Sequence, residues 1–279
     1  MLVELAIGDA YGAGFEYSPD QMIREQNDLR GYVQHPRHDI RPGCYTDDTQ
    51  MSMAIAEAFV SGEPWTRENL AHRFVTAFKC DEREGYARRF YAFLQSIQDG
   101  DEFLAKIRPN SDKSGAAMRA APIGTFSNVS TVIDRCRLQA AITHDTPDGI
   151  NAAIATSLMS HYFIHKVGPK LELPDFITEF VPGSWTVPWQ GKVGAQGLMS
   201  VYAALTAIMA HDSLSAILKT CIDFTGDVDT VATIALAAAS CSDEVVQDLP
   251  SVLIDTLEND EYGLGYLRKL DAQLMNNVE

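Results

Sequence analysis

Two acidic segments, far apart in the chain, contain the residue types most able to do chemistry. Residues 45–51 read YTDDTQM and residues 225–231 read TGDVDTV. Each segment places two carboxylates and neighbouring threonine hydroxyls directly before an Ala-rich apolar stretch with helical spacing. Four carboxylates at two helix N-termini need either solvent or cations. If the two ends meet in space, they form an oxygen-lined site suited to hard divalent metals.

Each segment can also be interpreted as a simple helix start. Thr46 would cap the first helix, ahead of Asp47 and Asp48, and Asp227 or Asp229 would cap the second, because the helix dipole favours negative charge at its N-terminus. One such segment alone is typical of a cap. In both segments, however, one acidic residue exceeds what a cap needs, so the pair favours a metal site. No cluster of histidine and cysteine accompanies them, which disfavours zinc.

A glycine-rich run at residues 5–16 allows two interpretations. Gly8, Gly12 and Gly14 would weaken an ordinary surface helix. The run therefore predicts either a buried helix that packs tightly through its glycine face or a backbone that approaches a ligand closely. In the second interpretation, the loop after the helix delivers Glu16 to the ligand. The residues alone favour neither interpretation.

Two further segments are candidates for ligand contact. In residues 112–124 a polar loop passes through Gly115 into a short helical stretch, which can present backbone N–H groups to a phosphate. This loop lacks the spacing of a Walker motif, and a plain helix start fits it equally well. His144 lies between two stretches with helical patterning, at the entry to a long helix. A lone histidine in such a place is more often structural than catalytic.

The spacing of apolar residues predicts an all-α protein, because they recur mainly three and four positions apart. Strand signals are confined to Val33 and residues 185–187. The Gly- and Pro-rich pieces show no shift in composition, so we interpret them as loops within a single domain, 1–279. Helices are expected, within two to four residues, at about 2–10, 48–61, 67–79, 83–98, 115–121, 129–142, 148–165, 173–180, 195–210, 213–223, 229–241 and 262–275.

Composition excludes several classes of partner. The chain of 279 residues has 22 Lys and Arg against 38 Asp and Glu, a net charge of −16. That balance argues against nucleic acid and against an anionic membrane surface.

Five scattered cysteines without a C-x-x-C pair indicate no disulfide framework and favour a reducing cytoplasm. The N-terminus lacks the features of a signal peptide, and no stretch approaches the ~18 apolar residues of a membrane span. No coiled-coil pattern appears, so a monomer is expected.

Taken in order, these segments resemble the ADP-ribosylglycohydrolase family. The likeness covers nearly the whole chain, and the combination of motifs is specific although no single motif is. It implies an all-α, single-domain orthogonal helical bundle. The residues that carry it are GDAYG at 8–12 with Glu16, TDDT at 46–49, GAAMRAAPIG at 115–124, Thr143 with His144, and GDVDT at 226–230.

The resemblance also implies ligands and roles. Two Mg²⁺ ions, or two Mn²⁺ ions, would be held by Thr46, Asp47, Asp48, Asp227, Asp229 and Thr230. Glu16 matches a mobile acidic residue that covers the metals and contacts the ribose. Glu16, Asp48 and Asp229 are the candidates for acid and base catalysis, with no assignment between them. Substrate contacts are expected from Gly12, Ser114, Gly115, Ala116, Ala117, Met118 and His144.

The implied activity is metal-dependent hydrolysis of the glycosidic bond between ADP-ribose and an acceptor. The substrate would be an ADP-ribosylated protein, modified on arginine, serine or another side chain, or a small ADP-ribosyl compound. Ser114, Thr225 and Val228 depart from the family's usual residues; none of these changes removes a proposed metal ligand, but they leave substrate preference open. Three alternatives stay open: a catalytically silent ADP-ribose binder, an immunity protein that blocks a toxin ADP-ribosyltransferase, and a metal-dependent phosphohydrolase.

Overall fold

The computed structural model describes residues 1–276 and 278. Over these residues it contains helices and loops and no β-strand. Four isolated β-bridges join loop segments, among them Lys113 with Gln196 and Val193 with Gly226. The predicted all-α class is confirmed. None of the helices in this part of the chain combines the length and the apolarity needed to cross a membrane.

Fourteen α-helices and three short 3-10 helices are present in the described residues. The α-helices are α1 (Leu2–Ala13), α2 (Asp20–Gln26), α3 (Asp47–Ser61), α4 (Arg67–Cys80), α5 (Arg88–Ser96), α6 (Gly100–Lys106), α7 (Val129–Ala141), α8 (Pro147–Ile164), α9 (Leu173–Phe180), α10 (Gly197–Ala210), α11 (Leu214–Asp223), α12 (Val228–Ala239), α13 (Ser251–Asp255) and α14 (Leu264–Asn276). The 3-10 helices are η1 (Ser114–Ala116), η2 (Ala121–Thr125) and η3 (Lys170–Glu172).

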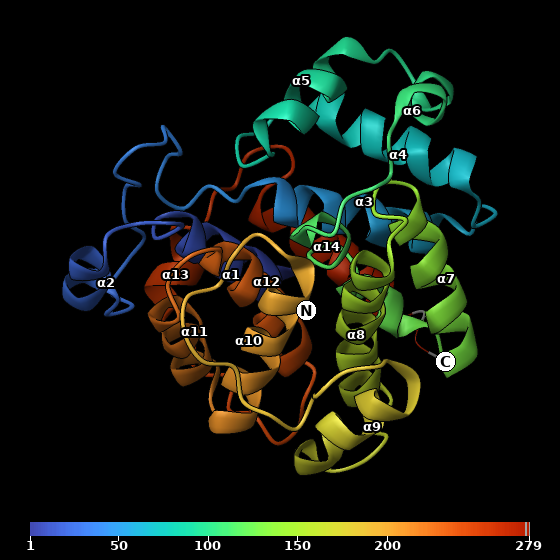
Figure 1. Ribbon diagram of the computed structural model, residues 1–279. Helices are drawn as coiled ribbons and strands as arrows, with labels where there is room; N and C mark the ends of the chain where they lie inside the picture. Colours follow the sequence, from blue (N-terminus) through green and yellow to red (C-terminus); the bar gives the residue numbers. More distant parts are fainter. Residues whose placement is uncertain (277, 279) are drawn as a thin grey trace.

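Helices α1 and α12 form the centre of the molecule and pack against each other along much of their length (Figure 1). A Cβ atom added to Gly8 would lie 2.6 Å from the carbonyl oxygen of Ala232, and one added to Gly12 would lie 2.4 Å from the Cα atom of Asp229. Glycine is therefore required at both positions for the two helices to approach. Of the two interpretations of this run, the structure supports tight packing through the glycine face.

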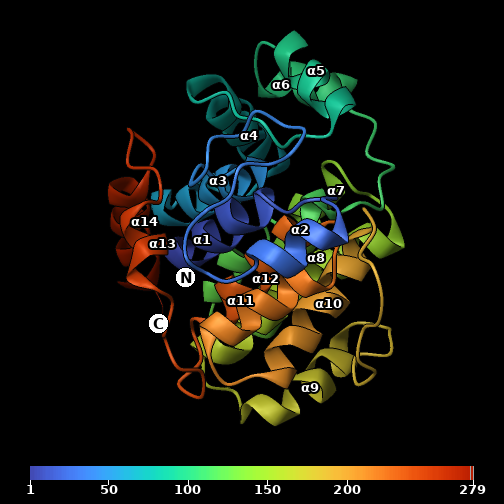
Figure 2. The same cartoon turned by 90° about the vertical axis from the view of Figure 1, so that its left-hand side faces the viewer.

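The remaining helices surround this central pair. Helices α8, α10 and α11 pack against α12, and α3 and α14 pack against α1. Helices α4, α5 and α6 form a lobe beyond α3, and α9 lies at the opposite end of the molecule in both ribbon views (Figures 1 and 2). One hydrophobic cluster includes residues from the central helices and from this lobe. The expectation of a single domain stays a prediction.

Two helix predictions were wrong in their extent. The helix expected at 83–98 begins only at Arg88, because Gly85 has φ +103°, outside the helical region. The helix expected at 115–121 is a 3-10 turn followed by further turns, and Pro122 next to it lacks the N–H that a continuing helix would use. Helices α2, α6 and α13 were not predicted; each has seven residues or fewer, too short to show a clear period.

The two strand candidates were also wrong. Val33 and residues 185–187 lie in loops and turns. A strand is stable only when a neighbouring strand satisfies its backbone groups, and no such partner exists in the described part of the chain.

Candidate functional site

A buried carboxylate on α1 organises the start of α3. Asp9 accepts hydrogen bonds from the backbone N–H groups of Thr46 and Thr49, both at 2.9 Å, and from their hydroxyl groups, at 2.8 and 2.6 Å. Burial raises the pKa of Asp9, and these four hydrogen bonds oppose that rise. The interpretation of Thr46 as a side-chain cap was wrong, because its hydroxyl donates to Asp9. The side chains of Asp47 and Asp48 are thus not needed as caps.

A tight turn that requires glycine presents the second pair of carboxylates at the start of α12. Gly226 has φ +96°, and a Cβ atom there would lie 1.9 Å from the carbonyl oxygen of Val193. The carbonyl oxygen of Gly226 accepts a hydrogen bond of 2.8 Å from the N–H group of Tyr17, which ties the loop after α1 to this turn. Asp227 occupies the N-cap position, yet its side chain makes no capping hydrogen bond. Its cap interpretation was therefore wrong as well.

The two helix starts meet at one cavity of about 460 Å³. Glu16, Asp227 and Asp229 offer carboxylate oxygens that lie within 4.8 Å of one another. Three buried carboxylate oxygens at this place have no hydrogen-bond partner among the described residues; they are Asp48 Oδ2, Asp227 Oδ2 and Asp229 Oδ1. Unpartnered buried carboxylate oxygens are costly, so a ligand is expected to complete them.

The raised pKa values of the clustered carboxylates also indicate that a ligand is needed at this place. Burial, and after it the charges of neighbouring acids, raises the pKa of Asp47, Asp48 and Asp229 well above the ordinary value. Burial and the charge of Asp227 raise the pKa of Glu16 to about 7, and burial raises the pKa of Asp227 to about 6. These carboxylates destabilise one another when all are ionised. A cation among them would relieve that repulsion.

The donor set fits a hard divalent cation. The oxygens available here are those of carboxylates and hydroxyls, which Mg²⁺ and Mn²⁺ prefer as ligands. The three residues whose oxygens lie close together, Glu16, Asp227 and Asp229, are all acidic. Thr46 is 1% exposed, and its hydroxyl oxygen keeps lone pairs available after donating to Asp9. These observations agree with the sequence-based expectation of an oxygen-lined metal site.

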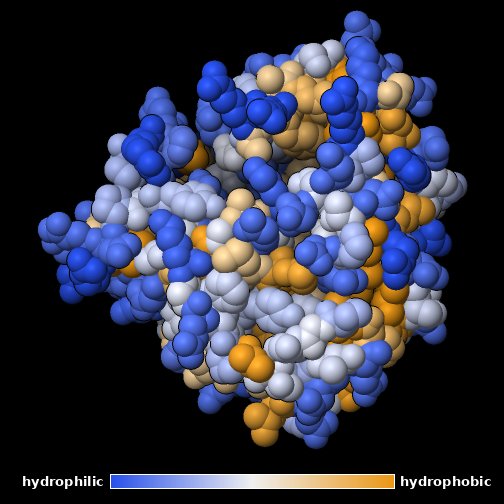
Figure 3. All heavy atoms as spheres, viewed as in Figure 1, coloured by the Kyte–Doolittle hydropathy of each residue, from blue (hydrophilic) through white to orange (hydrophobic). Residues whose placement is uncertain are grey.

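The other residues that line the cavity are of two kinds. The polar lining includes Arg108, Ser111, Lys113, Ser114, Gly115, Arg119, Thr143 and His144. The apolar lining includes Met51, Ala87, Phe90, Ile107 and Met118. The surface is hollowed between the α4–α6 lobe and the body of the molecule, with apolar surface on the lobe side (Figure 3). A ligand with both an anionic part and an apolar part matches this lining.

Ten of the predicted site residues line this cavity: Glu16, Asp47, Asp48, Ser114, Gly115, Met118, His144, Asp227, Asp229 and Thr230. Four others do not. Thr46 lies behind the cavity against Asp9, and Gly12 lies against the backbone of Asp229. Ala116 and Ala117 are fully buried. The functional roles of all fourteen stay predictions.

Sequence reasoning gave no role to three residues at this site. Asp9 stands in an apolar run, where a carboxylate can be buried only with partners, and that was the available signal. Gly85 lines the cavity, and a Cβ atom there would lie 2.4 Å from Asp47 Oδ1. Nothing local to Gly85 identifies this contact, since it joins segments 38 positions apart. Arg119 is a buried cation among the polar residues that line the cavity.

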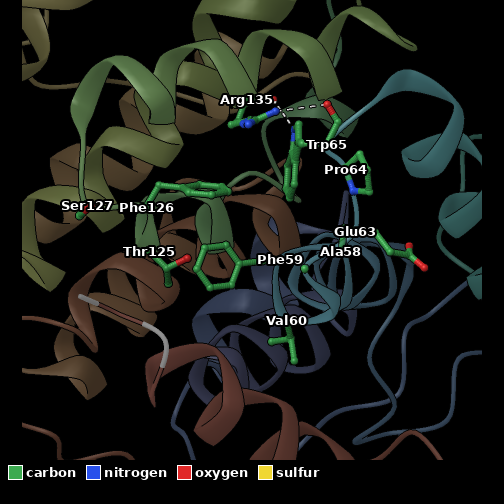
Figure 4. Close-up of a pocket in the computed structure, with 11 residues that line it drawn as sticks. Ala58, Phe59, Val60, Glu63, Pro64, Trp65, Thr125, Phe126, Ser127 and Arg135 are labelled. Atoms are coloured by element: carbon green, nitrogen blue, oxygen red, sulfur yellow. Dashed lines mark hydrogen bonds between the residues drawn. The ribbon is translucent and has the colours of Figure 1, made fainter.

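A second cavity, of about 530 Å³, lies at the other end of α3 (Figure 4). Phe59, Trp65 and Phe126 form its aromatic walls. Trp65 Nε1 donates to the carbonyl oxygen of Arg135, and Arg135 Nη1 donates to that of Trp65. Among the lining residues only Glu63 is acidic, so this cavity lacks the facing carboxylates of the first. The candidate site is therefore the cavity between the two helix starts.

Comparison with known proteins agrees with this geometry. A family model described as ADP-ribosylglycohydrolase matches residues 1–278. The chain belongs to the ADP-ribosylglycohydrolase family. It is 31% identical to ADP-ribosylhydrolase ARH3 of Bos taurus over 168 residues, which cover 56% of this chain and 46% of that protein. The match spans about half the length of the Bos taurus protein and of the Xenopus tropicalis protein, where the share is 48%.

Other ADP-ribosylglycohydrolase relatives match over more of their length. The chain is 23% identical to the ADP-ribosyl-[dinitrogen reductase] glycohydrolase of Rhodospirillum rubrum, over 98% of this chain and 90% of that protein. A solved structure titled "ADP-ribosylglycohydrolase-related protein complex" superimposes with a TM-score of 0.73 at 21% identity, covering 98% of this chain and 94% of that chain. At that identity the superposition supports the fold alone.

Proposed function

We propose that this protein is a metal-dependent hydrolase that cleaves the glycosidic bond between ADP-ribose and an acceptor, so reversing ADP-ribosylation. One observation carries the proposal. Unpartnered, buried carboxylate oxygens from two helix starts face one cavity, whose other walls offer hydrogen-bond donors and an apolar surface. Membership of the ADP-ribosylglycohydrolase family and the names of the relatives support it.

The proposed cofactor is a pair of Mg²⁺ or Mn²⁺ ions. The residues proposed to hold them are Thr46, Asp47, Asp48, Asp227, Asp229 and Thr230, with Glu16 beside them. When bound, such ions supply Lewis acidity toward sugar hydroxyls and water. The oxygen-only donor set supports hard cations without distinguishing magnesium from manganese.

The side chains of this chain would supply binding and proton transfer. Glu16, Asp48 and Asp229 are the groups proposed to carry protons to the leaving acceptor and from the attacking water. The segment from Ser114 to Met118, with His144, is proposed to bind the polar part of the ADP-ribosyl group. Because the protein carries −16 overall, anion binding must come from local donors such as these and from the bound cations.

The test is the release of free ADP-ribose from ADP-ribosyl-arginine and ADP-ribosyl-serine peptides, with Mg²⁺, with Mn²⁺ and with a chelator. Metal-dependent release from one peptide would establish the activity and identify the linkage. Binding of ADP-ribose without release from either peptide would favour a catalytically silent protein. Release of AMP instead, from hydrolysis of the diphosphate bond, would favour a phosphohydrolase.

The acceptor and the assembly state belong to the same proposal. The acceptor is proposed to be a protein side chain, and the peptide pair above distinguishes arginine from serine. A monomeric state and a cytoplasmic location stay predictions from the sequence. Sedimentation velocity on the purified protein checks the first of these, and fractionation of source cells checks the second.

A further inference from the structure

Arg119 is a buried cation without an acidic partner. It is 1% exposed, and its guanidinium forms no ion pair with a carboxylate in the part of the chain that the structure describes. Its Cζ atom instead lies 4.4 Å from the centre of the Phe74 ring. Burial lowers the pKa of Arg119 to about 10, so the side chain stays charged at neutral pH. Burying a cation without an acidic partner costs free energy, and such groups are found at functional sites.

The guanidinium makes hydrogen bonds to two residues of the α7 region. Its Nε donates to Gln139 Oε1 at 2.7 Å, and its Nη2 donates to Thr143 Oγ1 at 2.8 Å. Gln139 in turn donates from Nε2 to the carbonyl oxygen of Ala116 at 3.0 Å. Arg119 is therefore linked to two parts of the polar lining. Through Gln139 it is linked to the 114–118 segment, and through Thr143 it is linked to His144.

Thr143 links Arg119 to the ring of His144. Arginine can only donate, so Thr143 Oγ1 accepts from Arg119 and keeps one hydrogen to give. Thr143 Oγ1 lies 2.7 Å from His144 Nδ1, within hydrogen-bond distance. When the hydroxyl donates to Nδ1, the proton of a neutral ring lies on Nε2. Burial and the charge of Arg119 lower the pKa of His144 to about 3, which agrees with a neutral ring.

The other ring nitrogen of His144, Nε2, faces Gly115 at the cavity. His144 is 8% exposed and lines the cavity together with Ser114 and Gly115. A Cβ atom on Gly115 would lie 3.0 Å from the Cε1 atom of His144 and 3.3 Å from its Nε2 atom. The absence of a side chain at Gly115 therefore allows this edge of the ring to approach the segment expected to bind the ligand.

We propose that Arg119, acting through Thr143, holds His144 as a neutral ring with its proton on Nε2, so that the cavity presents a fixed hydrogen-bond donor to an oxygen of the ADP-ribosyl diphosphate. The identity of that oxygen's group rests on the proposed function. Arg119 and Thr143 are positioning residues in this arrangement, and His144 binds the substrate without exchanging a proton with it.

The first test measures the tautomer directly. A long-range ¹H–¹⁵N NMR spectrum of the wild-type protein in chelator, with the His144 signals assigned by their loss in His144→Gln, reports which ring nitrogen is protonated. The expected result is a neutral ring with the proton on Nε2 at every pH from 5 to 8. A proton on Nδ1, or a ring that becomes charged in this range, would overturn the proposal. This readout needs no turnover, so it stands apart from the success of the proposed function.

The second test measures ADP-ribose binding by calorimetry. Thr143→Val removes the hydroxyl and is expected to weaken binding about 10-fold and to allow the Nδ1 tautomer. Thr143→Ser, which keeps the hydroxyl, is expected to recover most of that loss. Thr131→Val makes the same change at the other end of α7, away from the cavity, and is expected to bind as the wild type does. Equal binding by Thr143→Val and wild type, or equal losses in Thr143→Val and Thr143→Ser, would overturn the proposal.

If the wild-type protein binds ADP-ribose but releases none from the peptides, the hydrolase proposal fails and the donor proposal is still decided by these two tests. If it binds no ADP-ribose at all, the proposed ligand is wrong, and the tautomer spectra of the wild type and Thr143→Val together decide whether Thr143 acts on His144 as described.

Discussion

Asp9 and Asp229 are both buried aspartates near helix starts, yet their surroundings differ in one respect. Asp9 is 0% exposed and accepts four hydrogen bonds from Thr46 and Thr49. Asp229 is 6% exposed, and its Oδ1 atom has no partner among the described residues. A buried carboxylate whose hydrogen bonds are all made can stabilise a fold. A buried carboxylate with an unpartnered oxygen destabilises the fold, so its presence suggests a functional role. Burial alone therefore does not identify a functional carboxylate; the state of its hydrogen bonds does.

Among the predictions that test this comparison, the largest effect is expected from a substitution at Asp229. Asp229→Asn is expected to abolish metal-dependent release of ADP-ribose, because it removes one of the facing carboxylates. In chelator the same variant should unfold at the same temperature as the wild type or higher, because a buried carboxylate with an unpartnered oxygen and acidic neighbours has been removed. Peptide hydrolysis and thermal unfolding measure the two effects.

The control for Asp229 is Asp243→Asn, at an exposed aspartate whose ion pair with Lys166 lies on the surface. Surface pairs contribute little, so both activity and unfolding temperature should match the wild type. Turnover by Asp229→Asn at saturating metal would refute the site.

Asp9 should show the opposite behaviour. Asp9→Asn replaces an acceptor of four hydrogen bonds by a group that is itself half donor, so the free energy of unfolding should fall by about 3 kcal/mol. Urea denaturation measures this fall. The matched change Asp134→Asn, at an exposed position on α7, should alter stability by less than about 0.5 kcal/mol. Equal stability of Asp9→Asn and wild type would remove the structural role given to Asp9.

Gly85 tests whether the lobe helps to position the α3 carboxylates. Gly85→Ala would place a Cβ atom 2.4 Å from Asp47 Oδ1. Metal affinity or turnover should fall about 10–100-fold, the range typical of residues that support metal ligands. Gly62→Ala is the control, because Gly62 also has positive φ but nothing lies within 4 Å of the added atom. Both variants place alanine at a positive φ, +103° at Gly85 and +67° at Gly62, so an equal loss of activity in both would attribute the effect to backbone strain alone.

The smallest expected effect is on pH dependence in chelator. Glu16 has a folded pKa of about 7 against an ordinary 4.5, and Asp227 about 6 against 3.8. At a pH between the ordinary and the folded pKa of each group, the folded protein keeps a proton that the unfolded chain has released. The free energy of unfolding should therefore fall as the pH rises from about 4.5 to 7. Unfolding temperatures at pH 5 and 7.5 measure this fall, and saturating Mg²⁺ or Mn²⁺ should reduce it. A metal-free protein that gains stability over this range would contradict the raised pKa values.

Much of the fold and some of the site follow from sequence patterns. The three- and four-residue spacing of apolar side chains predicted most of the long helices, because one face of a helix must be buried. The paired Asp segments predicted that two helix starts would need cations. The short helices α2 and α13 and the turn after Ser114 were not predictable, since a few residues carry no measurable period.

The sequence by itself determined the helical class, the family resemblance and the carboxylates at 47, 48, 227 and 229 as the residues to examine. Only the tertiary structure decided that these carboxylates meet, that Asp9 caps α3 from another helix, and that Thr143 lies between Arg119 and His144. Local patterns report which face of an element is buried. The pairing of a donor with an acceptor between distant segments depends on where the whole chain packs, as Asp9 and Thr46, 37 positions apart, illustrate.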